Sequence, residues 1–231
     1  MGYWRRAQGL SVPQMTVGIE RADGIVVASI DDGKANALNL EMIAELRSAL
    51  ESAIDEKSPF IITGRKGYFS AGFELKTMRS GDRDRISELA GQGSLLFREI
   101  LAAPIPILAA CGGHALAAGA LLLLAADYKI GQPGGYTIGL NETRIGIALP
   151  QFAIDIARFR LSTKHLVAAT LFASVLTPEE ACDFGYLDRI EPDARAAAHV
   201  LATDMASVGL AAFATSKKRM NAQIVRQLSE N

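Results

Sequence analysis

The sequence predicts an α/β protein, and three observations support that prediction. Short runs of β-branched residues alternate with longer helix-like runs through the first 150 residues, a pattern typical of βαβ units. Glycine and proline separate the runs. After Pro150 the pattern becomes largely helical. We therefore expect an α/β core over residues 1–150, followed by a helical section over residues 151–231.

The chain begins with a predicted hairpin and a helix. Residues 1–14 are expected to form a loose leader. Two β-rich runs, 15–20 and 25–30, flank the turn-forming sequence Arg-Ala-Asp-Gly. Asn39 stands where a helix N-cap belongs, and apolar residues then recur at every third or fourth position. Pro59 ends this helix, because proline has no backbone N–H to donate.

The next segments are read from their glycine content and hydrophobic pattern. We expect a buried strand over 60–63, a glycine-punctuated loop over 64–78, a solvated loop over 79–85 and a helix over 86–102.

One long segment, between Glu99 and Asp127, contains no formally charged residue. Its length alone would suggest a membrane span. However, two prolines and a Gly-Gly-His turn interrupt it, and a helix broken in this way would leave backbone groups unpaired in lipid. We therefore interpret it as buried core. The expected elements are a strand over 105–110, a turn at 112–114, a helix over 117–126 and a strand over 127–130.

The section after Pro150 is predicted to be helical over 151–173, 178–184 and 193–230, with a strand-like piece at 187–190.

Charge and cysteine content exclude several classes of function. Lys and Arg number 24 against 25 Asp and Glu, so no global positive field exists for nucleic acid or an anionic membrane. The two cysteines, Cys111 and Cys182, cannot form a disulfide framework. The first residues lack the apolar stretch of a signal peptide. A cytoplasmic protein is the simplest interpretation.

Two small-residue turns, 70–74 and 117–120, each lead toward a predicted helix. Small residues let a ligand approach the backbone, and the first turn of a helix has free N–H groups. Two such groups aimed at one point would form an oxyanion hole, which stabilises negative charge on a carbonyl oxygen. Tight packing of the turns against the sheet would explain the same residues, and the sequence leaves both readings open.

Acid–base candidates are few. Glu142 lies in an apolar, glycine-containing segment, and such surroundings raise a carboxyl pKa toward the value that suits a general base near neutrality. An ion pair with Arg144 is the alternative. The three histidines show no metal-ligand spacing, and His114 is read as a core or turn residue. Ser70 is not in a G-x-S-x-G context, so we do not expect it to be a nucleophile.

Five segments taken together resemble the crotonase family, the enoyl-CoA hydratases and isomerases. The resemblance covers nearly the whole chain, in family order and spacing. The matching segments are KANALN (34–39), FSAGFELKTM (69–78), HALAAGALLLLAADYKI (114–130), IGLNETRIGIALP (138–150) and TPEEACDFGYLDRI (177–190). It implies a ββα spiral core over residues 1–150 and a helical C-terminal trimerisation section over residues 151–231.

The resemblance also implies roles for individual residues. The N–H groups of Phe73 and Ala118 match the two oxyanion-hole donors, and Glu142 matches the second catalytic glutamate of the hydratases. Leu121 occupies the position of the first glutamate. The positions that match the binding site for the acyl-CoA thioester are Lys34, Ala35, Asn36, Ala71, Gly72 and Leu121.

The loss of the first glutamate predicts the reaction. Hydratases use two carboxylates, whereas one is sufficient to move a proton from C2 to C4 of a 3-enoyl thioester. We expect an enoyl-CoA isomerase, with a hydratase or a catalytically silent acyl-CoA binder as alternatives; an RNA-binding member is disfavoured by the balanced charge. The resemblance implies no cofactor beyond the coenzyme A of the substrate, no metal, and a homotrimer or a hexamer built from two trimers.

Overall fold

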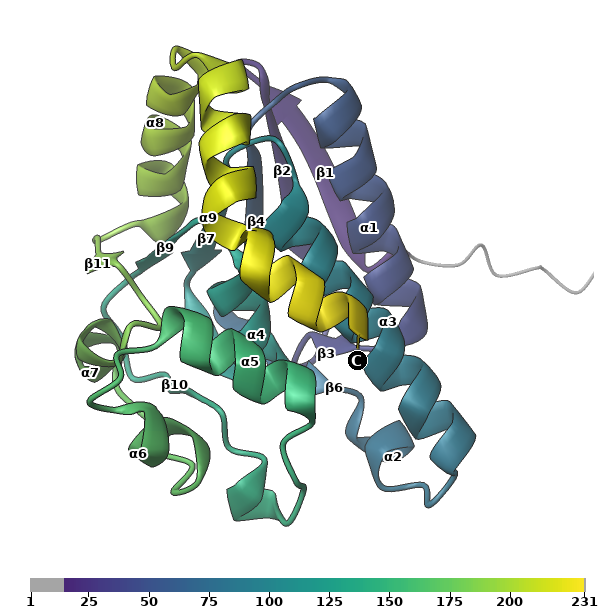
Figure 1. Ribbon diagram of the computed structural model, residues 1–231. Coiled ribbons are helices and arrows are strands. Elements are labelled where there is room, and N and C mark those ends of the chain that lie inside the picture. The colour runs from purple at the N-terminus through teal and green to yellow at the C-terminus, as the bar shows by residue number, and fades with distance from the viewer. Residues whose placement is uncertain (1–14, 231) are drawn as a thin grey trace, which may run out of the picture.

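A computed structural model describes residues 15–230, so the leader predicted over residues 1–14 lies outside the described part of the chain. A six-stranded sheet in the order β1-β2-β4-β7-β9-β11 forms its centre (Figure 1). The first two strands form an antiparallel hairpin, and every later pairing in this sheet is parallel. The strands are β1 (Val17–Ala22), β2 (Ile25–Ile30), β4 (Phe60–Gly64), β7 (Ile107–Cys111), β9 (Tyr128–Gly131) and β11 (Arg189–Ile190).

Most strands of the large sheet are followed by a short strand in a smaller sheet and then by a helix. One small sheet has the order β10-β8-β5, and the other pairs β3 with β6. This repetition of strand, short strand and helix is the ββα spiral that the resemblance implied. The short strands are β3 (Ala37–Leu38), β5 (Gly67–Ser70), β6 (Gly72–Phe73), β8 (Gly113–Leu116) and β10 (Ile138–Gly139).

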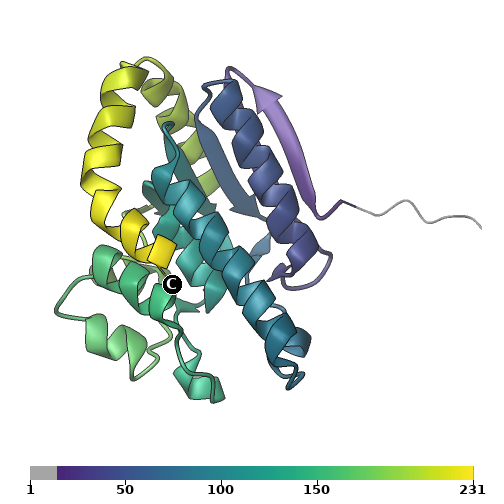
Figure 2. The same ribbon diagram turned by 45° about the vertical axis from the view of Figure 1, so that its right-hand side comes forward.

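Helices cover both faces of the large sheet. Helices α1 (Leu40–Asp55) and α3 (Arg83–Ala102) lie side by side over one face (Figure 2). The other face is covered by α8 (Ala194–Ala206), whose buried alanines pack on alternate strand residues such as Ile61 and Leu108. The remaining helical elements are α2 (Leu75–Met78), α4 (Ala118–Ala125), the 3-10 turn Thr143–Ile145, α5 (Gln151–Arg160), α6 (Leu166–Thr170), α7 (Pro178–Phe184) and α9 (Leu210–Glu230).

Local sequence signals explain several helix starts. Asn39 caps α1 as predicted, because its side chain accepts a hydrogen bond from the N–H of Met42 at 2.8 Å. Asp193 caps α8 in the same way. A capping box formed by Thr177 and Glu180 begins α7.

Three predictions about local structure were wrong. Residues 64–78 are not a loop, because β5, β6 and α2 lie within them. The turn predicted at 112–114 is largely strand β8, and helix α3 begins at Arg83 rather than residue 86. The short strands were missed because each pairs with a segment distant in sequence, as in Gly67 beside Gly113, so no local pattern marks them.

The helical prediction for the C-terminal section holds in part. The range 151–173, predicted to be largely helical, contains two helices, α5 and α6, separated by residues 161–165. Helix α9 runs from the end of α8 toward α3 (Figure 1). Strand β11 extends the large sheet by pairing with β9.

The long uncharged segment is β7, β8 and α4. Every residue of α4 is buried, so the lack of charge reflects a core helix. In residues 15–230, no single helix is long and apolar enough to cross a membrane; α8 and α9 pass that test only as a pair bent by 110°.

Helix α9 carries a buried cation that joins it to the core. Lys217 is 3% exposed, and its Nζ donates to Asp127 Oδ2 at 2.6 Å and to the carbonyl oxygen of Ile105 at 3.2 Å. The same Asp127 oxygen accepts from the N–H of Ile107 at 2.9 Å. Asp127 follows α4 directly, so this ion pair joins α9 to the junction between α4 and the large sheet.

We predict that Lys217→Met destabilises the fold by about 3 kcal/mol, because it leaves the Asp127 carboxylate buried without its cation. The free energy of unfolding, measured by urea denaturation, checks this. Lys218→Met is the matched control, since Lys218 is exposed on the same helix, and it should change stability by less than about 0.5 kcal/mol. Equal effects of the two substitutions would contradict the prediction.

Candidate active site

The segments that carry Phe73, Ala118 and Glu142 follow neighbouring strands of one small sheet. In this sheet, Ala115 of β8 pairs with Ser70 of β5 on one side and with Ile138 of β10 on the other. These strands are parallel, so the chain leaves all three at the same edge. Phe73, Ala118 and Glu142 lie three, three and four residues beyond the paired residues, and the topology therefore brings them to one place.

Two contacts hold the segments that follow these strands close to one another. The N–H of Ala117 donates to the carbonyl oxygen of Gly139 at 3.0 Å, which joins the end of β8 to the end of β10. On the other side, a Cβ added to Gly72 would lie 3.0 Å from the nitrogen of Ala118 and 2.8 Å from Ala117 Cβ. Glycine at position 72 is thus required for the β6 and α4 backbones to approach this closely.

The N–H groups of Phe73 and Ala118 both suit an oxyanion hole. Ala118 is the first residue of α4, so its N–H has no partner within the helix. The N–H of Glu74 donates to Leu38 at 2.9 Å. Successive N–H groups of a strand point to opposite edges, so the N–H of Phe73 points away from β3.

The residue before Ala118 has an unusual backbone. Ala117 has φ 51° and ψ −126°, a conformation that L-residues rarely adopt. Such a residue costs on the order of 1–3 kcal/mol and persists where the surrounding structure imposes it. Here its N–H is held by Gly139, and its carbonyl oxygen accepts from the N–H groups of Ala120 and Leu121.

A hydrogen-bonded loop supports the Phe73 side of the site. Asn36 is fully buried, and its amide donates to the carbonyl oxygens of Ile30, Tyr68 and Phe69 at 2.9, 3.0 and 3.3 Å. Ser70 Oγ donates to the Asn36 carbonyl at 2.7 Å and accepts from the Gly72 N–H. The side chains of Asn36 and Ser70 therefore serve to join the two loops.

Asp32 organises the turn before Asn36. It accepts hydrogen bonds from the N–H groups of Lys34, Asn36 and Ala37 at 2.7, 2.9 and 3.1 Å. Burial opposes ionisation of Asp32, but these hydrogen bonds and the charge of Arg65 outweigh it and lower the pKa of the carboxyl. Asp32 was not predicted from the sequence, although an Asp before a Gly-containing turn is a known signal.

The remaining predicted substrate-binding residues lie along this loop. Lys34 is exposed, while Ala35 and Ala71 are partly exposed and joined by a hydrogen bond from the Ala71 N–H to the Ala35 carbonyl. Arg65 lies over the Tyr68 ring at 4.4 Å and donates to the Lys34 carbonyl. With exposed Lys66, the loop carries three cations, Lys34, Arg65 and Lys66, beside the two carboxylates Asp31 and Asp32, of which Asp31 lies 3.8 Å from Arg65.

Glu142 is buried on the other side of Ala118. It is 8% exposed, and its Oε2 accepts no hydrogen bond from any described residue. Burial raises the pKa of Glu142 to about 7, partly offset by a hydrogen bond from its own N–H. No ion pair joins it to Arg144 in the described part of the chain, so the alternative reading of Glu142 is not supported.

Leu121 and Tyr186 complete the apolar surroundings. Leu121 is 1% exposed, one turn into α4. Tyr186 is fully buried, and its hydroxyl accepts from the N–H of Leu140 at 3.3 Å, two residues before Glu142. Burial and, to a smaller degree, the charge of Glu142 raise the pKa of Tyr186. Nothing in the sequence indicated that Tyr186 lies beside the segment that carries Glu142.

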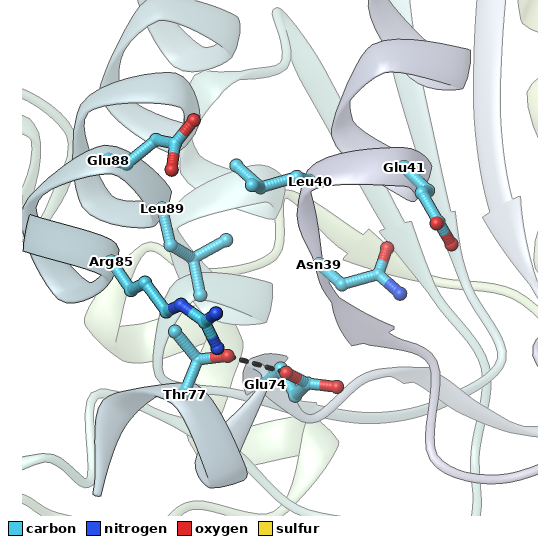
Figure 3. Close-up of a pocket in the computed structure, with 8 residues that line it drawn as sticks. All are labelled: Asn39, Leu40, Glu41, Glu74, Thr77, Arg85, Glu88 and Leu89. Atoms are coloured by element: carbon cyan, nitrogen blue, oxygen red, sulfur yellow. Dashed lines mark hydrogen bonds between the residues drawn. The ribbon is translucent and has the colours of Figure 1, made fainter. Parts of the chain in front are cut away.

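A groove of about 350 Å³ lies beside the site, between the start of α1, helix α2 and the start of α3 (Figure 3). On the α2 side of the groove, Thr77 Oγ1 donates to Glu74 Oε2 at 2.5 Å. Three of its lining residues are acidic, Glu41, Glu74 and Glu88, against one arginine, Arg85. This net negative charge disfavours phosphate groups, in contrast to the cations around Lys34.

The described residues contain no group of three or more His, Cys, Asp or Glu side chains that could hold a metal ion. His114 is a structural residue, as predicted, because its Nδ1 accepts from the N–H of Thr137 at 3.0 Å.

Comparison with known proteins agrees with this geometry. Residues 20–231 match the Enoyl-CoA hydratase/isomerase family. A probable enoyl-CoA hydratase of Rhodobacter capsulatus is 30% identical over 92% of this chain and 84% of its own. The mitochondrial enoyl-CoA delta isomerase 1 of Rattus norvegicus is 28% identical over 81% of this chain, and the match spans 66% of that protein's length.

A solved structure shows the same architecture. An enoyl-CoA hydratase/isomerase family protein from Pseudomonas syringae superposes with a TM-score of 0.90 at 33% identity, covering 93% of this chain and 94% of that one. The ββα spiral and its C-terminal helices are therefore the crotonase fold. The chain belongs to the enoyl-CoA hydratase/isomerase family, and it spans about two thirds or less of the length of the mitochondrial isomerases that it matches.

We predict that Glu142→Gln stabilises the protein at alkaline pH. The folded-state pKa of about 7 lies above the usual 4.5, so the folded protein binds more protons than the unfolded chain between these values, and stability falls as pH rises through them. Removing the carboxyl should add about 2–3 kcal/mol to the free energy of unfolding at pH 8 and little at pH 4.5.

Urea denaturation of wild type and variant at the two pH values measures this difference. The control is Glu51→Gln, since Glu51 is exposed on α1, and it should change stability by less than about 0.5 kcal/mol at either pH. A Glu142→Gln variant that is less stable than wild type at pH 8 would show that the carboxylate has a stabilising partner.

Proposed function

We propose that this protein is an enoyl-CoA isomerase that shifts the double bond of a 3-enoyl-CoA to the 2-position. The observation that carries the proposal is the buried Glu142 carboxyl, whose Oε2 accepts no hydrogen bond from a described residue and whose segment leaves the small sheet at the same edge as Phe73 and Ala118. The position that the resemblance matches to a second glutamate is the apolar, buried Leu121 of α4. A 1,3-proton shift needs one acid–base group and a stabilised oxyanion, and these residues supply both.

The proposed reaction has two steps. The Glu142 carboxylate removes a proton from C2 of the bound thioester, and the electron pair of that bond moves into the carbonyl. The dienolate oxygen then accepts hydrogen bonds from the N–H groups of Phe73 and Ala118. The protonated Glu142 returns the same proton to C4 as the double bond re-forms between C2 and C3, so the reaction has no net gain or loss of protons.

The burial of Glu142 supports this role. A pKa of about 7 leaves the carboxylate and the carboxylic acid both well populated at neutral pH, and one group must act as base and then as acid. The coenzyme would lie along Lys34, Ala35 and Ala71, with its phosphates near the cations of that loop and away from the acidic groove beside α2.

The central experiment offers the purified protein both 3-hexenoyl-CoA and 2-hexenoyl-CoA. We expect turnover of the 3-enoyl substrate, followed by the absorbance of the conjugated thioester, and little hydration of the 2-enoyl substrate. Glu142→Gln should lower kcat by about 10²–10⁴-fold, because it removes the only acid–base group of the site. Glu51→Gln should leave kcat unchanged.

The pH profile gives an independent check. The rate kcat/KM should fall below an apparent pKa of about 7, as Glu142 becomes protonated in the free enzyme. Preferential hydration of the 2-enoyl substrate would support the hydratase instead. Binding of both substrates without turnover would identify an acyl-CoA binder.

We also propose that the protein acts in the cytoplasm and assembles as a homotrimer or a dimer of trimers through its section 151–231. Exposed apolar side chains support self-association: Val167, Leu171 and Phe172, on and just after α6, are 55, 65 and 74% exposed. Covering such a patch removes apolar area from water.

Light scattering coupled to size exclusion measures the assembly. We expect the mass of three or six chains, and Phe172→Asp should shift it toward the mass of one chain. Val200→Asp adds the same charge at an exposed apolar residue of α8 and should leave the mass unchanged. A wild-type protein with the mass of one chain would refute the proposal.

A further inference from the structure

Phe73 contributes more to the site than its backbone N–H. Its ring lies directly on the backbone of α3 at Gly93, where an added Cβ would be 2.3 Å from the ring Cζ and 2.4 Å from Cε1. No side chain larger than glycine fits at position 93 while the ring keeps this place. Glycine within a helix lowers helix stability, and at position 93 of α3 packing of the Phe73 ring explains its presence.

The ring begins a row of aromatic side chains. Its centroid lies 6.5 Å from that of Phe97, which is fully buried, and Phe97 lies 6.3 Å from Phe152. Phe152 is in the first turn of α5, two residues beyond Pro150, which ends the segment that carries Glu142. The row therefore extends from one oxyanion donor toward the segment of the proposed base, and Leu121 belongs to the same buried cluster.

The position of the ring decides which part of a substrate it would meet. A carbonyl oxygen bound by the N–H of Phe73 places the carbonyl carbon and its two substituents within a few ångströms of the Phe73 side chain. The sulfur substituent leads to coenzyme A, along Ala35 and Ala71. The ring points the other way, to α3, and therefore borders the acyl substituent.

We infer that the Phe73 ring, seated on Gly93, is a specificity-determining element that restricts this enzyme to short acyl groups. The inference rests on the proposed binding of acyl-CoA in the hole formed by Phe73 and Ala118. The rings of Phe73, Phe97 and Phe152 follow one another from the Phe73 donor to the start of α5, and this row would limit the room for an acyl chain bound beside Phe73.

Binding of saturated acyl-CoA thioesters tests the inference without requiring turnover. Each methylene that enters an apolar pocket strengthens binding, whereas one that stays in water does not. Wild type should bind dodecanoyl-CoA no more tightly than hexanoyl-CoA by calorimetry. Phe73→Ala keeps the backbone N–H and removes the ring, and it should shift the ratio of the two affinities toward dodecanoyl-CoA by about tenfold or more.

A second pair of variants tests the seating of the ring. Gly93→Ala places a methyl group where the ring lies, so it should displace the ring and weaken hexanoyl-CoA binding by about tenfold. In the Phe73→Ala background the same methyl group enters vacated space, so the loss should disappear. Gly91→Ala is the matched control, since a Cβ there meets nothing within 4 Å, and it should leave binding unchanged.

The outcomes separate this inference from the proposed function. If both thioesters bind but Phe73→Ala leaves their ratio unchanged, the inference is wrong and the proposed function stands. The inference is also wrong if Gly93→Ala weakens binding equally with and without the ring. If neither thioester binds to the wild-type protein, both the inference and the proposed function are overturned.

Discussion

The site depends on one constraint, the parallel pairing of β5, β8 and β10 in a single small sheet. Because Ser70, Ala115 and Ile138 lie at one level of that sheet, the chain leaves three different ββα units at the same edge. Two residues complete this arrangement: glycine at position 72 lets the β6 and α4 backbones approach closely at φ +92°, and Ala117 carries local strain at φ 51°. Strand pairing and these two residues therefore assemble the candidate site from segments that are distant in sequence.

Burial acts on the site in two opposite ways. The buried surroundings of Glu142 keep it from water and raise the pKa of its carboxyl, which suits proton transfer near neutrality. The same surroundings make the ionised carboxylate unfavourable in the folded protein. The carboxylate of Asp127 differs from that of Glu142, because an ion pair with Lys217 compensates its negative charge. Asp127, which joins α9 to the core, therefore has a cation partner, whereas Oε2 of Glu142, the proposed base, accepts no hydrogen bond from a described residue.

Much of the fold could be predicted from local patterns, and the rest depended on tertiary contacts. The hairpin, the Asn39-capped helix and the buried character of the uncharged segment follow from periodicity, capping and glycine placement. The strands within 64–78 and at 113–116 could not be predicted from local patterns, because their partner strands lie far away in sequence. Among the candidate site residues, Glu142 and the two small-residue turns were candidates from the sequence pattern itself, and the family resemblance then singled out Phe73 and Ala118 as the donors. Asn36 matched a substrate-lining position, yet its side chain is fully buried in backbone hydrogen bonds. Gly93 and Tyr186 act only through partners that the sequence does not reveal.

The ion pair between Lys217 and Asp127 has a consequence for the order of folding. Asp127 follows the helix whose first residue is Ala118, while Lys217 lies in the last helix of the described chain. During synthesis the N-terminal elements emerge first, so the Asp127 carboxylate has no ion pair with Lys217 until α9 has been made. Until then, burying the ionised carboxylate is unfavourable. A nascent chain therefore acquires this link between α9 and the large sheet only after α9 has been synthesised.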